Sequence, residues 1–346
     1  MSGGLNNHER LTLRARLWRV PRWAALLSVG IVTIYLSTMA LTSGVRGDQL
    51  LPCAMILAVA FWSDRTRDFF VRTLPYTIYG IVYDFTHITE PLVQKLHVHV
   101  AEPYRFELAH FAVATAAGRM TLNQYFALHH WLIVDFFTGT AYLVFIYWAI
   151  GFGFYLVWTG RSGERRALAT GFGLAFLAMN LVGFATYYIY PAAPPWYVTS
   201  FGLGPANFAA QPSPAAAIRW DQLTGLHYFQ SFYAKSADIF GAMPSLHCAQ
   251  PLLVFLYGRH LRKPWLNWVQ GPYYLLVCFS AIYLQHHYVL DVLAGSAFAL
   301  TAYAVERLVT KSLGLKRHGS PWRTSGALRI PASTRTTLSP PPAEAK

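Results

Sequence analysis

The chain has 346 residues, of which 54% are hydrophobic and only 12% are charged, and its formal net charge is +13. Because soluble domains carry about 25% charged residues, this composition excludes an ordinary soluble domain and favours a helical membrane protein. We expect no nucleic-acid partner, since the basic residues form no stripe or known reader motif. The three cysteines, Cys53, Cys248 and Cys278, show neither a disulfide framework nor zinc-ligand spacing.

Residues 1–22 contain five arginines but no short cleavable apolar segment, which predicts a basic cytoplasmic N-terminus and not a signal peptide. Eight apolar segments follow within residues 23–312 and predict an all-α polytopic membrane protein with about eight transmembrane helices. The second and sixth are short for a bilayer, and the third contains Pro75 and Asp84. In chain order the segments are Trp23–Thr42, Gln49–Trp62, Phe69–Thr89, Trp131–Trp158, Ala167–Ile189, Pro244–Tyr257, Trp268–Gln285 and Val289–Val309.

The basic residues predict the orientation of these helices. If the N-terminus is cytoplasmic and all eight segments cross, 22 of the 28 Lys and Arg residues lie in inner segments and 6 in outer ones, as the positive-inside rule requires. Two long segments, 90–130 and 190–243, then lie on the outer face, the first partly along the membrane interface. Residues 313–346 are rich in Arg, Ser, Thr and Pro, and are predicted to be a disordered cytoplasmic tail.

The first segment with chemical potential is Gly241-Ala-Met-Pro-Ser-Leu-His247. Pro244 suits the first turn of a helix, so the backbone N–H groups around it are expected to point outward toward an anion. Ser245 adds a hydroxyl donor, and His247 could serve as a proton donor. The alternative interpretation is a simple helix start with a capping serine.

The second segment is Gln285-His-His-Tyr-Val-Leu-Asp291. His287 and Asp291 are four residues apart and therefore share a helix face. A carboxylate bonded to one imidazole nitrogen leaves the other nitrogen free as a nucleophile or base. The alternative is a polar pair at a helix start, with Asp291 as a partner of the helix dipole. Both segments fall at the outer end of a predicted helix, so they can meet at one membrane depth.

Pro-Ser-Leu-His followed about 40 residues later by His-x-x-x-Asp resembles the type 2 phosphatidic acid phosphatase superfamily. Together with Tyr190-Pro-Ala-Ala-Pro-Pro-Trp-Tyr197, these motifs are more specifically similar to the inositol phosphorylceramide synthases of the aureobasidin-sensitive type. The similarity covers about residues 69–309. It implies a six-helix phosphatidic-acid-phosphatase-like core with its active site at the outer membrane–water interface. That face would meet the periplasm in a bacterium, or the Golgi lumen in a eukaryote.

The resemblance also implies roles for individual residues. His287 would be the nucleophile that forms a phosphohistidine, and Asp291 would orient it. His247 would protonate the leaving alcohol and then deprotonate the acceptor. Ser245 would hold a phosphate oxygen, and Gly241 and His286 are grouped with it as phosphate-binding candidates.

Three positions depart from the phosphatases of the superfamily, which carry two cations in their first motif and one in their third. This chain has Gly183, Tyr190 and Ala281 at the corresponding positions. A phosphate monoester is nearly dianionic, whereas a diester carries one charge, so a site with fewer cations suits a diester. This favours transfer of a phospho-head group over phosphatase action.

Other polar residues lie outside these two segments. Arg219 and Lys235 are the basic residues of the outer segment before Pro244 and are candidate phosphate ligands, with an exposed loop charge as the alternative. Asp84 and His87 have no assigned role. The spacings of His97, His99, His129 and His130 match no zinc motif, so we predict neither a metal site nor a cofactor.

The sequence therefore predicts a membrane phosphotransferase, with phosphatidylinositol as the expected donor and ceramide as the expected acceptor. One alternative is a lipid phosphatase or phosphodiesterase that uses water as its acceptor. The other, from a different class, is a catalytically silent scaffold or transporter.

Overall fold

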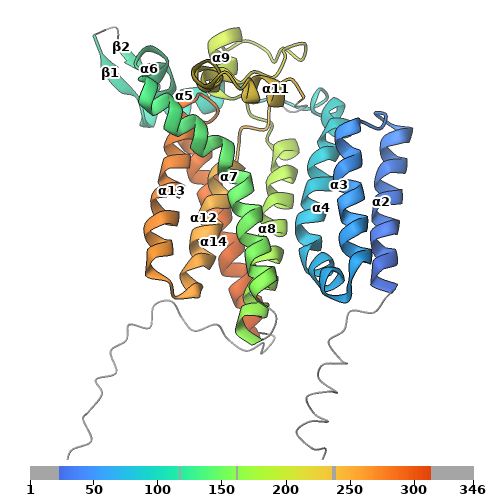
Figure 1. Cartoon of the computed structure of the whole chain (residues 1–346). Coiled ribbons are helices and arrows are strands. Elements are labelled where there is room, and N and C mark those ends of the chain that lie inside the picture. The colour runs from blue at the N-terminus through green and yellow to red at the C-terminus, as the bar shows by residue number, and fades with distance from the viewer. Residues whose placement is uncertain (1–22, 117, 161–162, 236–238, 313–346) are drawn as a thin grey trace, which may run out of the picture.

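The computed structural model describes residues 23–312 apart from 117, 161–162 and 236–238. The predicted basic N-terminus and the predicted tail both lie outside the described residues. Eight long helices correspond one to one with the eight predicted segments (Figure 1). They are α2 (Trp23–Leu41), α3 (Gly47–Trp62), α4 (Asp64–Val93), α7 (Leu132–Thr159), α8 (Gly163–Ile189), α12 (Leu246–Gly258), α13 (Pro264–Tyr283) and α14 (Val289–Ser312).

The short elements gather at one end of this bundle, opposite the end at which α2 begins and α14 ends (Figure 1). Segments 90–130 and 190–243, both predicted for one face, therefore do share an end. At the other end, a short 3-10 helix, η2 (Arg259–Leu261), joins α12 to α13. The elements at the gathered end are α5 (Ala101–His110), the antiparallel strands β1 (Val113–Thr115) and β2 (Gly118–Met120), α6 (Leu122–Leu128), α9 (Pro195–Phe201), η1 (Ala215–Ala217), α10 (Ile218–Thr224) and α11 (Tyr228–Tyr233).

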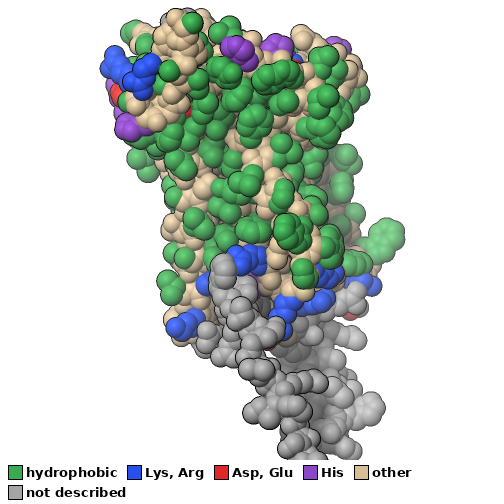
Figure 2. Space-filling model, turned by 90° about the vertical axis from the view of Figure 1, so that its left-hand side faces the viewer, with side chains coloured by type: hydrophobic (Ala, Val, Ile, Leu, Met, Phe, Trp, Pro, Cys, Tyr) green, Lys and Arg blue, Asp and Glu red, His purple; other side chains and the backbone are tan. Residues whose placement is uncertain are grey.

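The surface of the bundle suits a membrane. Four helices, α2, α7, α8 and α14, are long and apolar enough to cross a bilayer, whereas α3 is apolar but has only 16 residues. Figure 2 shows a broad hydrophobic band on one face, with Lys and Arg gathered mainly below it. The chain is an all-α membrane protein, and the count of eight crossings stays a prediction.

Helix boundaries differ from the prediction where a capping residue lies outside the apolar run. The helix α4 begins at Asp64 and not at Phe69, because the Ser63 hydroxyl accepts a hydrogen bond from the Thr66 N–H. The helix α12 begins at Leu246, so the prediction that Pro244 starts it was wrong, and Ser245 is the N-cap. The centre of the bundle lies around α12, which packs against α7, α8, α13 and α14.

Candidate active site

Two imidazoles face each other at the end of the bundle that carries the short elements. His247 lies in the first turn of α12, and His287 lies in the loop between α13 and α14. Nε2 of His287 is 3.1 Å from Nδ1 of His247, which is a hydrogen-bonding distance. The fold thus brings together two residues that are 40 positions apart, as the sequence predicted.

A backbone carbonyl orients His287. Its Nδ1 lies 2.8 Å from the carbonyl oxygen of Ala242, whereas the nearest oxygen of Asp291 is 3.7 Å away. An Nδ1–H that donates to this carbonyl leaves the lone pair of Nε2 directed at His247. Orientation of the ring by Asp291 stays a prediction, and the Ala242 carbonyl is a closer partner that the sequence did not indicate.

Asp291 instead organises the surrounding backbone. Its carboxylate accepts the Tyr288 N–H at 2.8 Å, and its carbonyl accepts the Ser245 N–H at 2.9 Å. The residue is fully buried and within ion-pair distance of His287. Asp291 therefore fixes the loop that carries His287 and ties α14 to the start of α12.

At the predicted anion site, the N–H and the hydroxyl of Ser245 both have partners within the protein. Its N–H is already donated to Asp291, and its hydroxyl lies 3.4 Å from the Cys248 sulfur. Ser245 has no exposed surface. It serves here to join two helices, and phosphate binding by its hydroxyl stays a prediction.

Gly241 helps to place the carbonyl that orients His287. It pairs with Ala192, which also pairs with His99, so three extended segments meet at this point. The Ala192 N–H donates to the Phe240 carbonyl at 2.7 Å. The proline-rich segment that begins at Tyr190 thereby supports the Gly241-Ala242 loop, and phosphate binding by Gly241 stays a prediction.

A glycine on α14 allows the close approach of Ser245. A Cβ atom on Gly295 would overlap the Ser245 carbonyl oxygen. We therefore expect Gly295→Ala to lower stability by roughly 1–3 kcal/mol and to lower activity, as measured by thermal unfolding in detergent and by product formation. Gly151→Ala on α7 is the control, because its Cβ meets no atom within 4 Å. Equal behaviour of the two variants would contradict the assignment.

Aromatic rings enclose the two histidines and His286. Tyr142 stacks on His247 with 4.5 Å between ring centroids and on His286 with 5.1 Å, and Tyr233 also stacks on His286 at 4.9 Å. Burial, reinforced by the nearby His287, lowers the pKa of His286 to about 3. His286 is thus a neutral, stacked ring, and phosphate binding by it stays a prediction.

Neither predicted basic ligand contacts the histidine pair. Nε of Arg219 donates to the buried Asp135 at 2.7 Å, and its guanidinium lies over the ring of Tyr283. Its charge is already balanced, and it is not an exposed loop charge either. Lys235 is exposed and lines a separate cavity between α11 and the N-terminal helices. Phosphate binding by either residue stays untested.

The three positions without the expected cations are occupied by packing residues. A Cβ on Gly183 would lie 2.7 Å from Leu246, so a longer side chain would clash where α8 approaches α12. Ala281 is fully buried, and its carbonyl accepts the N–H groups of His286 and His287. Tyr190 stacks on His99 with 3.8 Å between ring centroids. In the described part of the chain, the hydrogen bonds and ring contacts of His247 and His287 involve no Lys or Arg.

Sequence reasoning missed Glu107 on α5. Its side chain is fully buried and accepts the N–H of Val289, the first residue of α14, at 3.1 Å. Burial, then the nearby Asp291 charge, raises the pKa of Glu107 to about 7, although the hydrogen bonds from Val289 and Leu290 oppose this. A lone Glu in an amphipathic segment carries no sequence signal for such a contact.

This raised pKa predicts pH-dependent stability. The carboxyl contributes full stability below its ordinary pKa of 4.5, and that contribution is lost as pH rises through about 7. We expect the free energy of unfolding to fall by up to roughly 3 kcal/mol between about pH 5 and about pH 8, and the melting temperature in detergent to fall with it. Glu107→Gln should flatten this fall. Glu102→Gln on the same helix is the control, because hydrogen bonding lowers the pKa of Glu102 and places its titration below this range. An unchanged slope in Glu107→Gln would contradict the assignment.

The scattered histidines separate into different environments. His97 and His99 lie with Glu102 so that their ligand atoms are within 4.8 Å of one another, while His130 lies near Asp135. His97 is 77% exposed and Glu102 49% exposed. We assign this group no metal, and the metal-free site stays a prediction.

A helical membrane fold with two hydrogen-bonded histidines beside a buried carboxylate defines a class of membrane-embedded enzyme. A family model described as PAP2 superfamily matches residues 118–305, more than half of the chain. The chain therefore belongs to the PAP2 superfamily, and the predicted resemblance is confirmed.

Two related proteins show which members of the superfamily this chain is similar to. The chain is 35% identical over 288 residues to the phosphoinositol dihydroceramide synthase of Bacteroides thetaiotaomicron, covering 80% of this chain and 90% of that protein. It is 38% identical over 143 residues to the inositol phosphorylceramide synthase catalytic subunit of Saccharomyces cerevisiae, covering 39% of this chain and 35% of that protein. No solved structure gives a significant match. This protein is an inositol phosphorylceramide synthase-like enzyme, so the prediction of an enzyme, and not of a silent scaffold, is confirmed.

Proposed function

We propose that this enzyme transfers phosphoinositol from phosphatidylinositol to the primary hydroxyl of ceramide or dihydroceramide. The observation that carries the proposal is the pair of facing histidines, 3.1 Å apart, in a chain whose relatives are named as synthases of this kind. One ring supplies a nucleophile and the other a proton, and a double displacement needs both.

The first step forms a phosphohistidine. Nε2 of His287 attacks the phosphorus of the donor, and the bond from phosphorus to the diacylglycerol oxygen breaks. His247, protonated in the complex with the anionic donor, delivers its proton to that oxygen and becomes neutral. The Ala242 carbonyl holds the Nδ1–H of His287 throughout, and the buried Asp291 carboxylate balances the positive charge on the rings.

The second step releases the product. Neutral His247 removes the proton from the acceptor hydroxyl, whose oxygen attacks phosphorus while the bond to Nε2 of His287 breaks. His287 then regains its lone pair and His247 its proton. Water entering at this stage would give inositol phosphate, so the aromatic rings of Tyr142 and Phe145 against His247 are suited to keeping the ring dry.

Mass spectrometry of the lipids made by the purified protein tests the proposal. Given phosphatidylinositol and ceramide, the enzyme should produce inositol phosphorylceramide and diacylglycerol in equal amounts. The second candidate, hydrolysis, is favoured only if free inositol phosphate appears and no ceramide-linked product forms.

We further propose that the chain is a multi-pass protein with its histidine pair on the outer face. A cysteine introduced at Ser213 should react with an impermeant reagent in intact cells. A cysteine at Ser162, which lies outside the described residues, should react only after permeabilisation. Labelling at Ser162 but not at Ser213 in intact cells would refute this topology.

A further inference from the structure

Two adjoining cavities lie beside the N-terminal helices, and the larger one extends to α11. One, of about 470 Å³, is named the head cavity, and the other, of about 340 Å³, the chain cavity. Both are lined by Arg46, Asp48, Tyr83 and Asp84, so they share a wall. His247 and His287 line neither of them.

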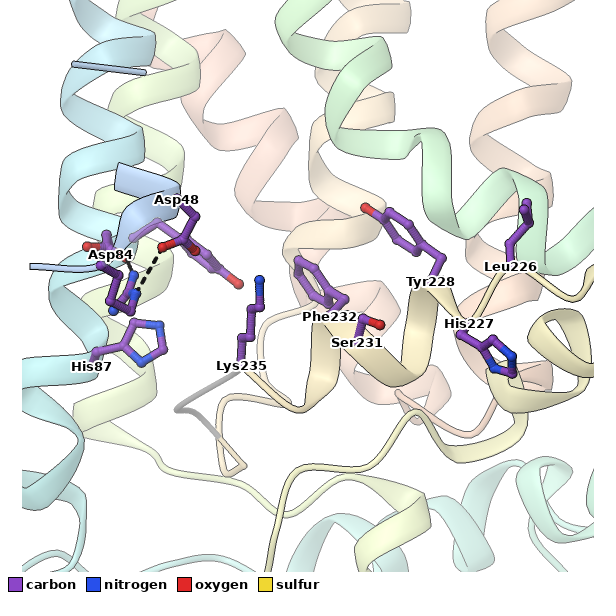
Figure 3. A pocket seen from close by; sticks show the side chains of 11 residues that line it. Asp48, Asp84, His87, Leu226, His227, Tyr228, Ser231, Phe232 and Lys235 are labelled. Atoms are coloured by element: carbon purple, nitrogen blue, oxygen red, sulfur yellow. Dashed lines mark hydrogen bonds and ion pairs between the residues drawn. The ribbon is translucent and has the colours of Figure 1, made fainter. Parts of the chain in front are cut away.

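The head cavity has a mixed lining, with charged and polar side chains beside aromatic and apolar ones. In Figure 3, Asp48 from α3 and Asp84 and His87 from α4 lie on one side of it, with Lys235 between them and Phe232 of α11. The Asp84 carboxylate accepts hydrogen bonds from Tyr35, Gln49 and Arg46. The cavity is thus a mixture of hydrogen-bond donors and acceptors at the end of the bundle that also carries the histidine pair.

The chain cavity is largely apolar and lies among α2, α3 and α4. Its wall includes Ile31 and Val32 of α2, Ile56 of α3 and Ile81 of α4. Gly80 also lines it, and a Cβ there would meet no atom within 4 Å. A chamber with several charged and polar groups that adjoins a largely apolar one matches the two ends of a single lipid. All three helices precede residues 118–305, so the family model does not describe this part of the chain.

The charges in the head cavity distinguish between lipids. Two carboxylates, Asp48 and Asp84, face two cations, Arg46 and Lys235. A phosphate anion would need an excess of cations, whereas hydroxyl and amide groups can donate to carboxylates and accept from an ammonium group. Balanced charge therefore favours a neutral head with several hydroxyl or amide groups.

We propose that the two cavities form a holding site for the acceptor, a neutral long-chain amide alcohol with its head in the head cavity and one chain in the chain cavity. The identity of this acceptor rests on the proposed function. The site adjoins the catalytic centre through α11: Phe232 lines the head cavity, while the next residue, Tyr233, stacks on His286 with its hydroxyl 3.3 Å from Nδ1. An acceptor bound here is separated from the histidine pair by the short helix α11.

Filling the chain cavity tests the proposal. Gly80→Leu adds a side chain where the structure has open space, and displacing about two methylenes of the lipid should raise the KM for ceramide about tenfold. The KM for phosphatidylinositol and the release of inositol phosphate without acceptor should not change. Gly30→Leu on α2 is the matched control, because its Cβ also meets open space but Gly30 lines neither cavity. A higher KM for phosphatidylinositol, or no effect on the KM for ceramide, would overturn the proposal.

A binding measurement keeps this test separate from the proposed function. The His287→Ala variant is irradiated with a photoactivatable ceramide, and the labelled peptides are identified by mass spectrometry. Labels on α2, α3 or α4 that disappear in the Gly80→Leu background support the holding site even if no transfer activity is found. Labels confined to other helices would refute the site even if the enzyme makes inositol phosphorylceramide.

Discussion

Replacing His287 by alanine is expected to reduce transfer by about a thousandfold or more, because a covalent step has no substitute nucleophile at that position. His286 is not expected to take over, since its ring is stacked against Tyr142 and Tyr233 and its Nδ1 lies 3.3 Å from the Tyr233 hydroxyl. Asp291→Asn should cost less, because the Ala242 carbonyl still orients the ring. The losses of the two variants should be less than additive if His287 and Asp291 act as one unit.

The measurement is formation of the ceramide-linked product by purified variants whose folding is checked by their melting temperature. A second readout uses phosphatidylinositol labelled at phosphorus, without acceptor. The intact enzyme should carry an acid-labile, alkali-stable label on the peptide containing His287, and the alanine variant should carry none. His286→Ala is the control, and it should retain the label. Near-normal transfer by His287→Ala would remove this residue from the mechanism.

Phosphatidylinositol is expected to be a better donor than phosphatidic acid, by about tenfold or more in kcat/KM. The physical reason is that uncharged residues, Gly183, Tyr190 and Ala281, stand at the positions where the phosphatases of the superfamily carry cations. Gly183 and Ala281 are in tight helix contacts, and Arg219 is paired with Asp135. A dianionic monoester would enter a site with little positive charge to offset the loss of its hydration, whereas a diester loses less.

The comparison requires both donors at equal mole fractions in mixed micelles, with and without ceramide. Transfer should outrun hydrolysis when ceramide is present. Gly183→Lys is not an informative rescue variant, because Leu246 blocks the position. Rapid release of inorganic phosphate from phosphatidic acid, with no ceramide-linked product, would show that the absence of these cations does not indicate the substrate class.

The helices and the meeting of His247 with His287 could be predicted because both depend on short patterns. Apolar runs define the helices, and the two motifs sit at helix ends on one side. The partners of the site residues could not be predicted in the same way. Arg219 meets Asp135 across 84 positions, and Glu107 meets Val289 across 182. Such contacts depend on how the loops pack.

Backbone partners are the other feature that the sequence conceals. A side-chain pattern such as His-x-x-x-Asp suggests a carboxylate partner for the imidazole, but every residue has a carbonyl oxygen. Ala242 became the partner because its segment is held by Ala192. Asp291 was correctly predicted to lie beside His287, and its main contacts proved to be with backbone atoms.

The short distance between the two histidines has a consequence for the resting protein. With Nε2 of His287 hydrogen-bonded to His247, the lone pair that would attack phosphorus is masked by the very group that would later supply the proton. An incoming donor must therefore exchange one hydrogen-bond partner for another before any covalent bond changes. In the resting enzyme the hydrogen bond between the two histidines therefore suppresses the nucleophile. Only a ligand that separates the two rings makes the lone pair of His287 available.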